Sequence, residues 1–333
     1  MIKRLLILVS LVAAPTLFAS ALTGRDLVIP VAGRGPGAHG SQWRTDVVIT
    51  NVATSGDPIE VGIQVPGLQR TFLNVTVAPG ETSITRDAIR TWFGREVGAS
   101  YIRVAAREEN AKLAAYARIS NGDVGQIVPA IPVASAGRIA SISAIDGGAG
   151  TRTNIGFVIL GYPAIATITL LDAKGATRVT KTHDTDYGFA QINDVYSWLG
   201  VAPQDGDSLR VASEQPLVAY ASVIRDASGD ADMIVGASID MPTHEVVAPS
   251  SCAQPAELQH DAFPAPGYIV VYKDGVSIAA RTAELATKYG FAPRDVWVYV
   301  GMFYSYFTAE QLAGLRCESD IAYISENAIG FFD

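Results

Sequence analysis

The side chains of this chain that could perform acid–base, nucleophilic or metal chemistry are few and scattered. No two of its four histidines have the spacing of metal ligands; they are His39, His183, His244 and His260. The Gly-x-Ser-x-Gly signature of a nucleophilic serine is also absent. The densest polar cluster, His183-Asp184-Thr185-Asp186, is more typical of a solvated hairpin turn than of a catalytic site. We therefore predict no enzymatic activity, no cofactor and no metal site.

The two cysteines, Cys252 and Cys317, are the other residues with covalent chemistry available to them. In an oxidising compartment an even pair of cysteines indicates a disulfide. The bond would link positions 65 residues apart and would restrict the unfolded chain. The alternative is a pair of buried free thiols, because a sequence does not reveal whether the two Cα atoms come close enough to be bridged.

The N-terminus indicates that the chain is exported. Two basic residues at 3–4 precede an apolar run at 5–18, and small residues at 19–21 supply a cleavage site. The run is too short to cross a bilayer comfortably, so we favour a signal peptide over residues 1–21 that is removed, rather than a membrane anchor. We expect a mature protein secreted to the extracellular space or the periplasm, with no stable membrane anchor.

Composition favours a β-rich protein of more than one domain. The length of 333 residues allows two or three domains. The 31 glycines and 17 prolines favour many turns between strands. The net charge of −8 and the absence of any Lys/Arg cluster lead us to expect no nucleic-acid partner.

Residues 25–250 contain an internal duplication. Four short blocks recur in the same order, at offsets between 104 and 108 residues: Trp43–Ile49 with Thr151–Phe157, Asp87–Gly94 with Asp194–Gly200, Tyr101–Ala105 with Ser208–Ala212, and Ala115–Ala117 with Ala219–Ala221. A repeat of about 105 residues is the usual size of one β-sandwich. Alternating or β-branched runs, separated by turn-forming residues, indicate strands in both copies. We predict two β-sandwich repeats, at residues 25–136 and 137–241, and a Pro-rich linker at 242–266.

Some features of the repeats invite a functional interpretation. Trp92 and Trp198 occupy equivalent positions and could form a carbohydrate platform, but a place in the core at the end of each sandwich explains them more simply. The recurring Arg-Thr-Asp/Asn at 44–46 and 152–154 is best explained by structure. Each arginine would pair with an acid of its own repeat, and the residues after it suit the beginning of a strand.

The pattern of residues 267–327 predicts a small α+β domain. Its elements run strand, helix, strand, strand, helix, strand, at Tyr268–Lys273, Ser277–Tyr289, Asp295–Val300, Met302–Phe307, Thr308–Arg316 and Ile321–Ser325. We expect Ser277 to cap the first helix, and Thr308 and Gln311 to form a capping box at the second. This order is that of the ferredoxin-like (βαββαβ) fold, one antiparallel sheet with two helices on one face. The chain as a whole is thus predicted to be mostly β, with two tandem β-sandwich repeats followed by this domain.

A single layer of helices leaves one face of the predicted sheet uncovered. In the two middle strands the Val and Phe positions suit the helix side, and alternation places the remaining large residues on the open face: Trp297, Tyr299, Met302, Tyr304 and Tyr306. A contiguous aromatic patch in water indicates a partner. The alternative is that the patch docks against the second sandwich of the same chain.

The C-terminal region also resembles a known family. Gly-Tyr-Ile-Val-Val-Tyr-Lys-Asp-Gly at 267–275, the capped helix at 308–316 and Asp-Ile-Ala-Tyr-Ile-Ser-Glu-Asn at 320–327 occur in the order seen in the subtilisin propeptide. That family (inhibitor family nine) includes free-standing inhibitors of subtilisin-like serine proteases, and the resemblance covers residues 267–333. Ala322–Asn327 is similar to the family's Ala-Tyr-Val-Glu-Glu-Asp. The central segment departs from the family, which carries glycine before the phenylalanine and small residues after it.

The resemblance implies a function and a set of contact residues. In the family the open sheet face packs on the protease, here through Trp297, Tyr299, Tyr304 and Tyr306. Glu326 and Asn327 match acidic positions that cap helix N-termini of the protease. The tail matches the segment that lies in the substrate cleft as an added strand, with Ile329, Phe331, Phe332 and Asp333 as its contacts. Phe332 suits the apolar primary pocket better than Asp333 does, so inhibition is weak unless Phe332 fills that pocket.

The resemblance also distinguishes an inhibitor from an enzyme. In a protease precursor a catalytic domain follows the propeptide, whereas here Asp333 is the last residue, and the catalytic signatures Asp-Thr-Gly, His-Gly-Thr and Gly-Thr-Ser-Met are absent. We therefore expect a secreted, reversible inhibitor of a subtilisin-like serine protease, with the β-sandwiches as presentation modules. The alternative is a surface adhesion or structural protein whose C-terminal module assists folding or docks a partner.

Overall fold

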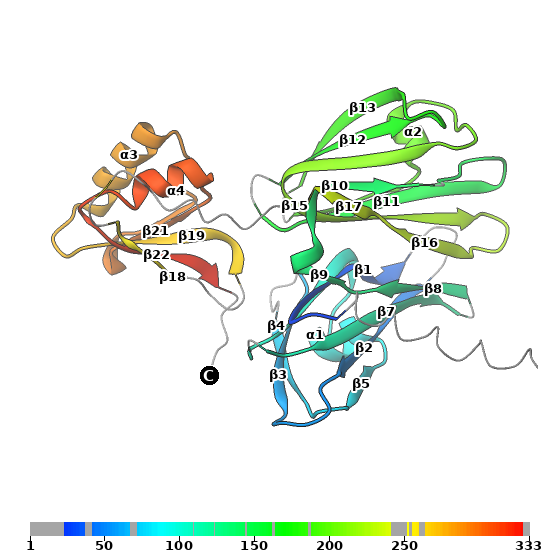
Figure 1. Ribbon diagram of the computed structural model, residues 1–333, viewed down its shortest axis with the longest axis horizontal. Helices are drawn as coiled ribbons and strands as arrows, with labels where there is room; N and C mark the ends of the chain where they lie inside the picture. Colours follow the sequence, from blue (N-terminus) through cyan, green and yellow to red (C-terminus); the bar gives the residue numbers. More distant parts are fainter. Residues whose placement is uncertain are drawn as a thin grey trace, which may run out of the picture. The chain divides into compact units, whose positions relative to one another are not determined.

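A computed structural model of the chain describes residues 23–36, 42–66, 72–108, 110–122, 124–143, 145–161, 164–185, 188–240, 252, 255–259 and 264–328. These residues form a mostly β structure with several sheets (Figure 1). Two compact units divide at Ser135/Ala136, with residues 228–231 belonging to the first. No helix in the described ranges is long and apolar enough to cross a membrane.

The first repeat consists of antiparallel strands and one short helix. Its elements are β1 (Asp26–Pro36), β2 (Gln42–Asn51), β3 (Ile59–Gln64), β4 (Phe72–Val77), β5 (Thr82–Thr85), α1 (Ala88–Phe93), β6 (Val97–Ala106), β7 (Leu113–Asn121), β8 (Val124–Pro129), β9 (Ile131–Pro132) and the 3-10 turn η3 (Val133–Ser135). One series of paired strands runs β4-β3-β6-β1-β9 and another runs β5-β2-β7-β8. A short ladder between β1 and β2 joins the two series.

Burial along these strands follows their position in the sheets. The central strand β1, which pairs with β2, β6 and β9, has eight of its eleven residues buried. In β3 burial alternates strictly, so Ile59, Val61 and Ile63 point into the core and the residues between them face solvent. The apolar core of the first repeat is thus supplied mainly by the Val, Ile and Leu residues of its central strands.

The second repeat reproduces the pairing of the first. Its elements are β10 (Gly137–Ile142), β11 (Thr151–Ile159), β12 (Ile165–Leu171), β13 (Thr177–Asp184), β14 (Phe189–Ile192), α2 (Val195–Leu199), β15 (Ser208–Arg225), β16 (Ala231–Val235) and β17 (Ala237–Asp240). Each of its strand pairs has a counterpart in the first repeat. In this correspondence the strands of the second repeat take the places of strands in the first in order: β10, β11, β12, β13, β14, β16 and β17 replace β1, β2, β3, β4, β5, β8 and β9. The long β15 takes the place of both β6 and β7.

The short helices α1 and α2 begin in the same unusual way. Each follows an aspartate in the left-handed region, Asp87 at φ 44° and Asp194 at φ 50°. The side chain of Asp46 accepts a hydrogen bond from the Asp87 amide at 2.9 Å, and Asn154 accepts one from the Asp194 amide at 3.0 Å. Because a left-handed aspartate costs free energy, these side chains stabilise a strained turn that both copies share.

The recurring Arg-Thr-Asp/Asn motif therefore has a structural role. Besides the contacts of Asp46 and Asn154, Thr45 bonds both backbone groups of Gly33, with the hydroxyl donating to its carbonyl at 2.7 Å. Arg152 pairs with Asp226, an acid of its own repeat, as expected. Arg44 instead donates to the Ser120 hydroxyl at 3.4 Å.

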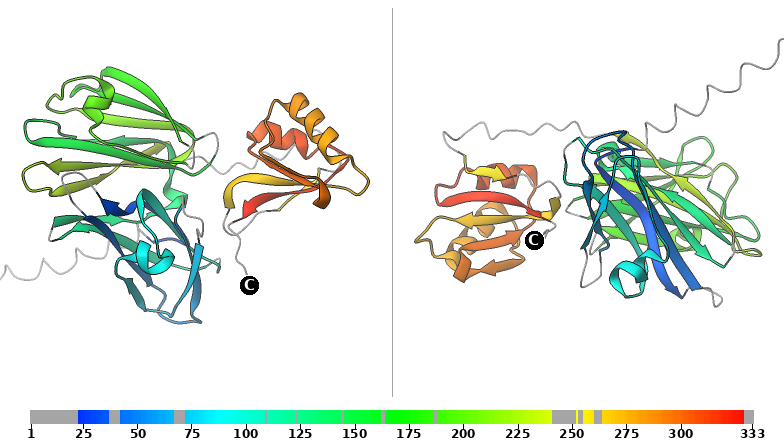
Figure 2. Two further views of the ribbon diagram at one scale, coloured as in Figure 1. Left: turned by 180° about the vertical axis from the view of Figure 1, so that it is seen from behind. Right: turned by 90° about the horizontal axis from the view of Figure 1, so that it is seen from below.

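The C-terminal module forms a five-stranded sheet with two helices on one face (Figures 1 and 2). Its elements are β18 (Glu257–Gln259), β19 (Pro264–Tyr272), α3 (Ile278–Tyr289), β20 (Asp295–Trp297), the 3-10 turn η4 (Val298–Val300), β21 (Met302–Ser305), α4 (Ala309–Leu315) and β22 (Ile321–Ala328). The strand order is β18-β22-β19-β21-β20, in which β18 and β22 are parallel and the other pairs are antiparallel.

Both helices of this module begin where the sequence predicts. Ser277 precedes α3, although its side chain makes no capping hydrogen bond, and Gly290 ends the helix at φ 70°. The capping box of α4 is confirmed: Thr308 accepts from the Gln311 amide at 3.2 Å, and Gln311 accepts from the Thr308 amide at 2.9 Å. On α3 the buried residues are Ile278, Thr282 and Leu285.

One strand expectation is wrong. The predicted strand Asp295–Val300 ends at Trp297, and residues 298–300 form a 3-10 turn closed by Gly301 at φ 72°. The prediction left a single residue, Gly301, to reverse the chain into the next strand, whereas a hairpin loop needs at least two residues. The four-residue loop 298–301 meets that requirement, and in consequence the expected alternation of faces stops at Trp297.

Candidate protein-interaction site

The sheet face of the C-terminal module opposite the helices is largely apolar. Val270 pairs with Phe303 in one neighbouring strand and with Ile324 in the other. All three side chains lie on the helix side of the sheet and are fully buried. Alternation therefore directs their strand neighbours to the opposite face. These are Ile269, Val271, Met302, Tyr304, Tyr323 and Ser325, and each is half-buried.

The helix-side core makes this face rigid. Leu285 of α3 and Leu315 of α4 are both 0% exposed and pack in one cluster with Phe303. The Phe303 ring stacks on Phe291 with centroids 5.7 Å apart, and Phe307 meets Phe291 edge-on at 4.9 Å. Close aromatic packing of this kind leaves little freedom for the strands that carry the open face.

Tyr304 and Tyr306 are held in place by specific neighbours. Their rings meet edge-on with centroids 5.5 Å apart, and the Arg294 guanidinium lies 5.4 Å from the centre of the Tyr306 ring. The Tyr304 ring covers Gly267, where an added Cβ would lie only 2.5 Å from it. Gly267 also has φ +97°, so both its conformation and its neighbour require glycine.

The most exposed apolar residues of the module lie at the β20 edge of the sheet. Five consecutive large side chains are exposed there, Val296 by 39%, Trp297 by 40%, Val298 by 51%, Tyr299 by 104% and Val300 by 61%. We call residues 296–300 the apolar arm. Val296, Val298 and Val300 were expected to face the helices, and the turn after Trp297 places Val298 and Val300 in solvent instead. Such a run of exposed apolar residues is typical of an interaction surface.

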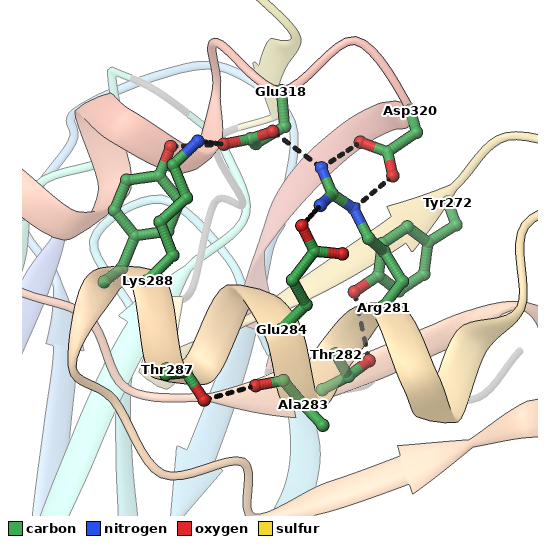
Figure 3. Close-up of polar contacts among 10 residues, drawn as sticks. Tyr272, Arg281, Thr282, Ala283, Glu284, Thr287, Lys288, Glu318 and Asp320 are labelled. Carbon is green, nitrogen blue, oxygen red and sulfur yellow. Dashed lines mark hydrogen bonds and ion pairs between the residues drawn. The ribbon is translucent and has the colours of Figure 1, made fainter.

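A network of charged side chains ties α3 to the segment between α4 and β22 (Figure 3). Arg281 binds both carboxylate oxygens of Asp320, at 2.5 and 3.1 Å, and also bonds Glu318 at 2.7 Å and Glu284 at 2.6 Å. Lys288 contacts Glu318 at 2.6 Å, and the Tyr289 hydroxyl donates to the same carboxylate. These bonds fix the direction in which the chain enters β22.

The network shifts the ionisation of its carboxylates. The hydrogen bond from Arg281 holds the pKa of Asp320 below its usual value. For Glu318, burial acts to raise the pKa, but the hydrogen bonds from Lys288 and Tyr289 outweigh it and the pKa is lowered. Both groups are thus held in the charged form at neutral pH.

The opposite edge of the sheet is closed by residues 252 and 255–259, which we call the strap. The disulfide between Cys252 and Cys317 is present, with the two Cα atoms 5.7 Å apart. The Ala256 amide donates to the Arg316 carbonyl at 2.6 Å, and the Arg316 side chain donates back to the Ala256 carbonyl at 2.9 Å. Leu258 packs on the core, and β18 runs parallel to residues 323–325 of β22.

The strap corrects part of the predicted linker. Residues 242–266 were expected to be a linker throughout, but 257–259 and 264–266 are strands of the module's sheet. Residues 242–251 lie outside the described ranges. The alternation Glu257-Leu258-Gln259, polar on either side of an apolar residue, is the signal that could have revealed β18.

The predicted contact residues fall into three groups. Trp297 and Tyr299 lie in the apolar arm, and Tyr304 and Tyr306 lie on or just after β21. Only the backbone of Glu326 and Asn327 is described, within β22. The tail residues Ile329, Phe331, Phe332 and Asp333 lie outside the described ranges.

The repeats offer no open aromatic platform at Trp198. This residue is half-buried against the core of the second repeat, and Lys181 lies over its ring at 5.3 Å while donating to its carbonyl at 2.6 Å. His183 does not lie in a turn, as was expected, but in β13, where it pairs with Ala166 and meets the rings of Phe157 and Trp198 edge-on. Trp92 is half-buried and contacts Phe93.

Comparisons with known proteins do not identify the chain. No protein-family model matches it, and a search of curated proteins finds no match. Within the described ranges no group of His, Cys, Asp and Glu could hold a metal ion. The geometry of the C-terminal module is therefore the basis for any functional assignment.

Proposed function

We propose that this protein is a secreted, reversible inhibitor of subtilisin-like serine proteases. The observation that supports the proposal is the architecture of the C-terminal module. Its elements from β19 to β22 run βαββαβ, with sheet order β22-β19-β21-β20 and both helices on one face. This order is the one expected of a ferredoxin-like domain, the fold of the subtilisin propeptide family that residues 267–333 resemble, and it supports the proposal.

The proposal gives each face of the module a role. The helix face is filled by the module's own core, whereas the opposite face offers Ile269, Val271, Met302 and Tyr304 to a partner. A large apolar face gains free energy when a complementary protein surface excludes water from it, at roughly 25 cal/mol per Å² of apolar area buried. The protease would occupy this face.

The tail would supply the inhibition itself. It follows directly from β22, which is extended as far as Ala328. An extended peptide adds to a protease cleft through backbone hydrogen bonds, and its side chains enter the pockets that set specificity. Because a tail that binds in this way forms no covalent bond with the enzyme, inhibition would be reversible and competitive with substrate.

We further propose that the two repeats are β-sandwiches that present the inhibitor. In each repeat one series of paired strands has five members and the other has four, with the long β15 serving in both series of the second repeat. Export by an N-terminal signal would place the inhibitor in the compartment where a disulfide is stable.

Inhibition of subtilisin by the purified mature protein tests the proposal. Residual activity is titrated against the protein at several substrate concentrations, with a variant lacking residues 329–333 in parallel. We expect competitive inhibition at micromolar or lower concentration, lost in the truncated variant. Ile127→Ser is the matched control because this side chain of the first repeat is 62% exposed, so inhibition should not change.

A negative result would have a definite meaning. If the folded protein fails to inhibit a panel of subtilisin-like proteases, the inhibitor proposal is wrong. The alternative, an adhesion or structural protein whose C-terminal module docks or assists the folding of a partner, would then be preferred. One observation favours this alternative. The apolar arm lies at the edge of the sheet, whereas the inhibitor proposal places the protease on the central strands of the open face.

A further inference from the structure

The strap places a covalent bond next to the strand from which the proposed inhibitory tail continues. The parallel ladder pairs Glu257 with Tyr323 and Gln259 with Ser325, only a few residues before the tail begins at residue 329. Without β18, β22 would be the edge strand of the sheet, paired only with β19. With the strap in place, β22 is therefore hydrogen-bonded to a strand on both sides; without the strap, it would be bonded on one side only.

The strap itself is short and depends on its anchors. Its ladder with β22 spans three residue pairs, and Leu258 is only half-buried. A three-residue strand does not hold an edge by itself, because ordering each residue costs about 1–2 kcal/mol of conformational entropy. The disulfide at Cys252 and the two hydrogen bonds between Ala256 and Arg316 supply the constraint that the ladder lacks.

We propose that the strap is a redox-sensitive clamp on β22, the strand that precedes the proposed inhibitory tail, and that inhibition depends on an intact disulfide. This inference rests on the proposed inhibitory function. Once the bond is reduced, β18 leaves the edge and residues 323–325 of β22 lose their outer partner. Inhibition is therefore strong in the oxidised protein and weak in the reduced one.

The chemical step is ordinary thiol–disulfide exchange with a dithiol. A thiolate of the dithiol attacks one sulfur of the Cys252–Cys317 bond and forms a mixed disulfide, which the second thiol of the reductant resolves. The bond between the two Sγ atoms is broken, each cysteine takes up one of the two protons of the dithiol, and the reductant leaves as a disulfide. Both cysteines are half-buried rather than fully buried, so a reductant has access to them.

The experiment compares the oxidised full-length mature protein with protein reduced by dithiothreitol, alkylated with iodoacetamide and freed of reductant. Hydrogen exchange is followed at the amides of residues 256–259 and, as an internal reference, at the central β19–β21 ladder. Subtilisin inhibition is measured on the same samples. We expect protection at 256–259 to be lost, the reference ladder to stay protected, and the inhibition constant to rise at least about fivefold.

The chain offers a matched control, because Cys252 and Cys317 are its only cysteines. The double variant Cys252→Ser with Cys317→Ser should behave like the reduced protein and should not respond to dithiothreitol. The clamp is excluded if residues 256–259 stay protected after reduction, or if they lose protection while the inhibition constant is unchanged.

A second variant covers the case in which reduction unfolds the whole module. Leu258→Ser keeps the disulfide but removes the apolar contact of β18 with the core, so it should loosen residues 256–259 in a folded module and weaken inhibition. Unchanged protection and inhibition in this variant would overturn the clamp. If even the oxidised protein does not inhibit, the proposed function fails, while the exchange measurement still decides whether the strap depends on the disulfide.

Discussion

The two edges of the C-terminal sheet are built in opposite ways. At one edge, β22 is covered by β18, cross-linked through Cys317 and held by the ion pairs of Glu318 and Asp320. At the other edge, the three-residue β20 is the outermost strand and pairs only with β21 among the described residues. The apolar arm that continues from it is exposed. Covalent, ionic and packing constraints thus gather at the edge that leads to the C-terminus.

The two edges prevent unwanted strand pairing in two different ways. An unpaired strand edge exposes backbone donors and acceptors and invites pairing with other chains, so proteins cover such edges or keep them short. The β22 edge is covered by the strap, whereas the β20 edge is kept short and its strand gives way to a turn. An apolar arm at a short edge suits a surface that is covered only when a partner binds.

Removing the disulfide should have the largest effect on this contrast. In the loop-entropy model, a bond between residues 65 apart stabilises the folded state by about 4 kcal/mol. The variant Cys252→Ser with Cys317→Ser should therefore lower the free energy of unfolding of the module by up to that amount. Urea unfolding followed by fluorescence measures the change in a protein whose other three tryptophans are replaced by phenylalanine, so that only Trp297 reports, with the same protein carrying the intact disulfide as reference. A midpoint that does not move would show that the closed edge is held by packing alone.

Breaking the ion-pair network should have the next largest effect, and this effect should depend on pH. Arg281→Met leaves Asp320 and Glu318, whose side chains are 24% and 11% exposed, without their shared partner. Hydrogen bonds to charged groups contribute about 1.5–3 kcal/mol, so we expect a loss of about 2 kcal/mol at pH 7.

The sign of the pH dependence follows from the lowered pKa values of Asp320 and Glu318. A carboxylate whose pKa is lower in the folded state stabilises the protein above its unfolded pKa, near 4, and this contribution is lost as the pH falls through the folded pKa. The unchanged protein should thus lose stability below about pH 4, and the difference between it and Arg281→Met should shrink there. Thermal unfolding of both proteins from pH 7 to pH 2.5 provides the test; a difference that is constant with pH would contradict it.

A matched pair of smaller substitutions compares the edges directly. Leu258→Ala removes side-chain atoms that pack on the core at the closed edge, and should cost roughly 1–2 kcal/mol because the residue is half-buried. Val298→Ala removes fewer atoms from a side chain that is 51% exposed at the open edge, and should change stability by less than about 0.5 kcal/mol. Equal losses of stability in the two variants would mean that side chains at the strap edge contribute no more to stability than those at the β20 edge.

The sequence predicts the elements of the module better than its edges. The capping box at Thr308 and Gln311 depends on residues only three apart, and it forms as predicted. The helix-side positions Phe303, Ser305 and Phe307 follow from strand alternation and are all buried. Local periodicity and capping determine these features, so a sequence contains the information needed to find them.

The features missed from the sequence depend on residues far apart in the chain. The disulfide between Cys252 and Cys317 was expected, but the strand β18 was not, because residues 257–259 pair with a strand more than sixty residues later. The turn after Trp297 was missed because the apolar run Val296–Val300 reads as a strand, although the chain must reverse before Met302. Equivalent left-handed aspartates in the two repeats also depend on distant partners, Asp46 and Asn154, each about forty residues away.

The smallest effect on stability is expected at Tyr299, yet this residue should separate stability from binding. Its side chain is fully exposed, so Tyr299→Ser should change the free energy of unfolding by less than about 0.5 kcal/mol. If the apolar arm contacts the protease, the same change should raise the inhibition constant several-fold, because aromatic residues are frequent among those that dominate binding energy. Isothermal titration and urea unfolding of the same preparation measure the two quantities. An unchanged inhibition constant would limit the contact surface to the sheet face and the tail, and would leave the open edge without a role in inhibition.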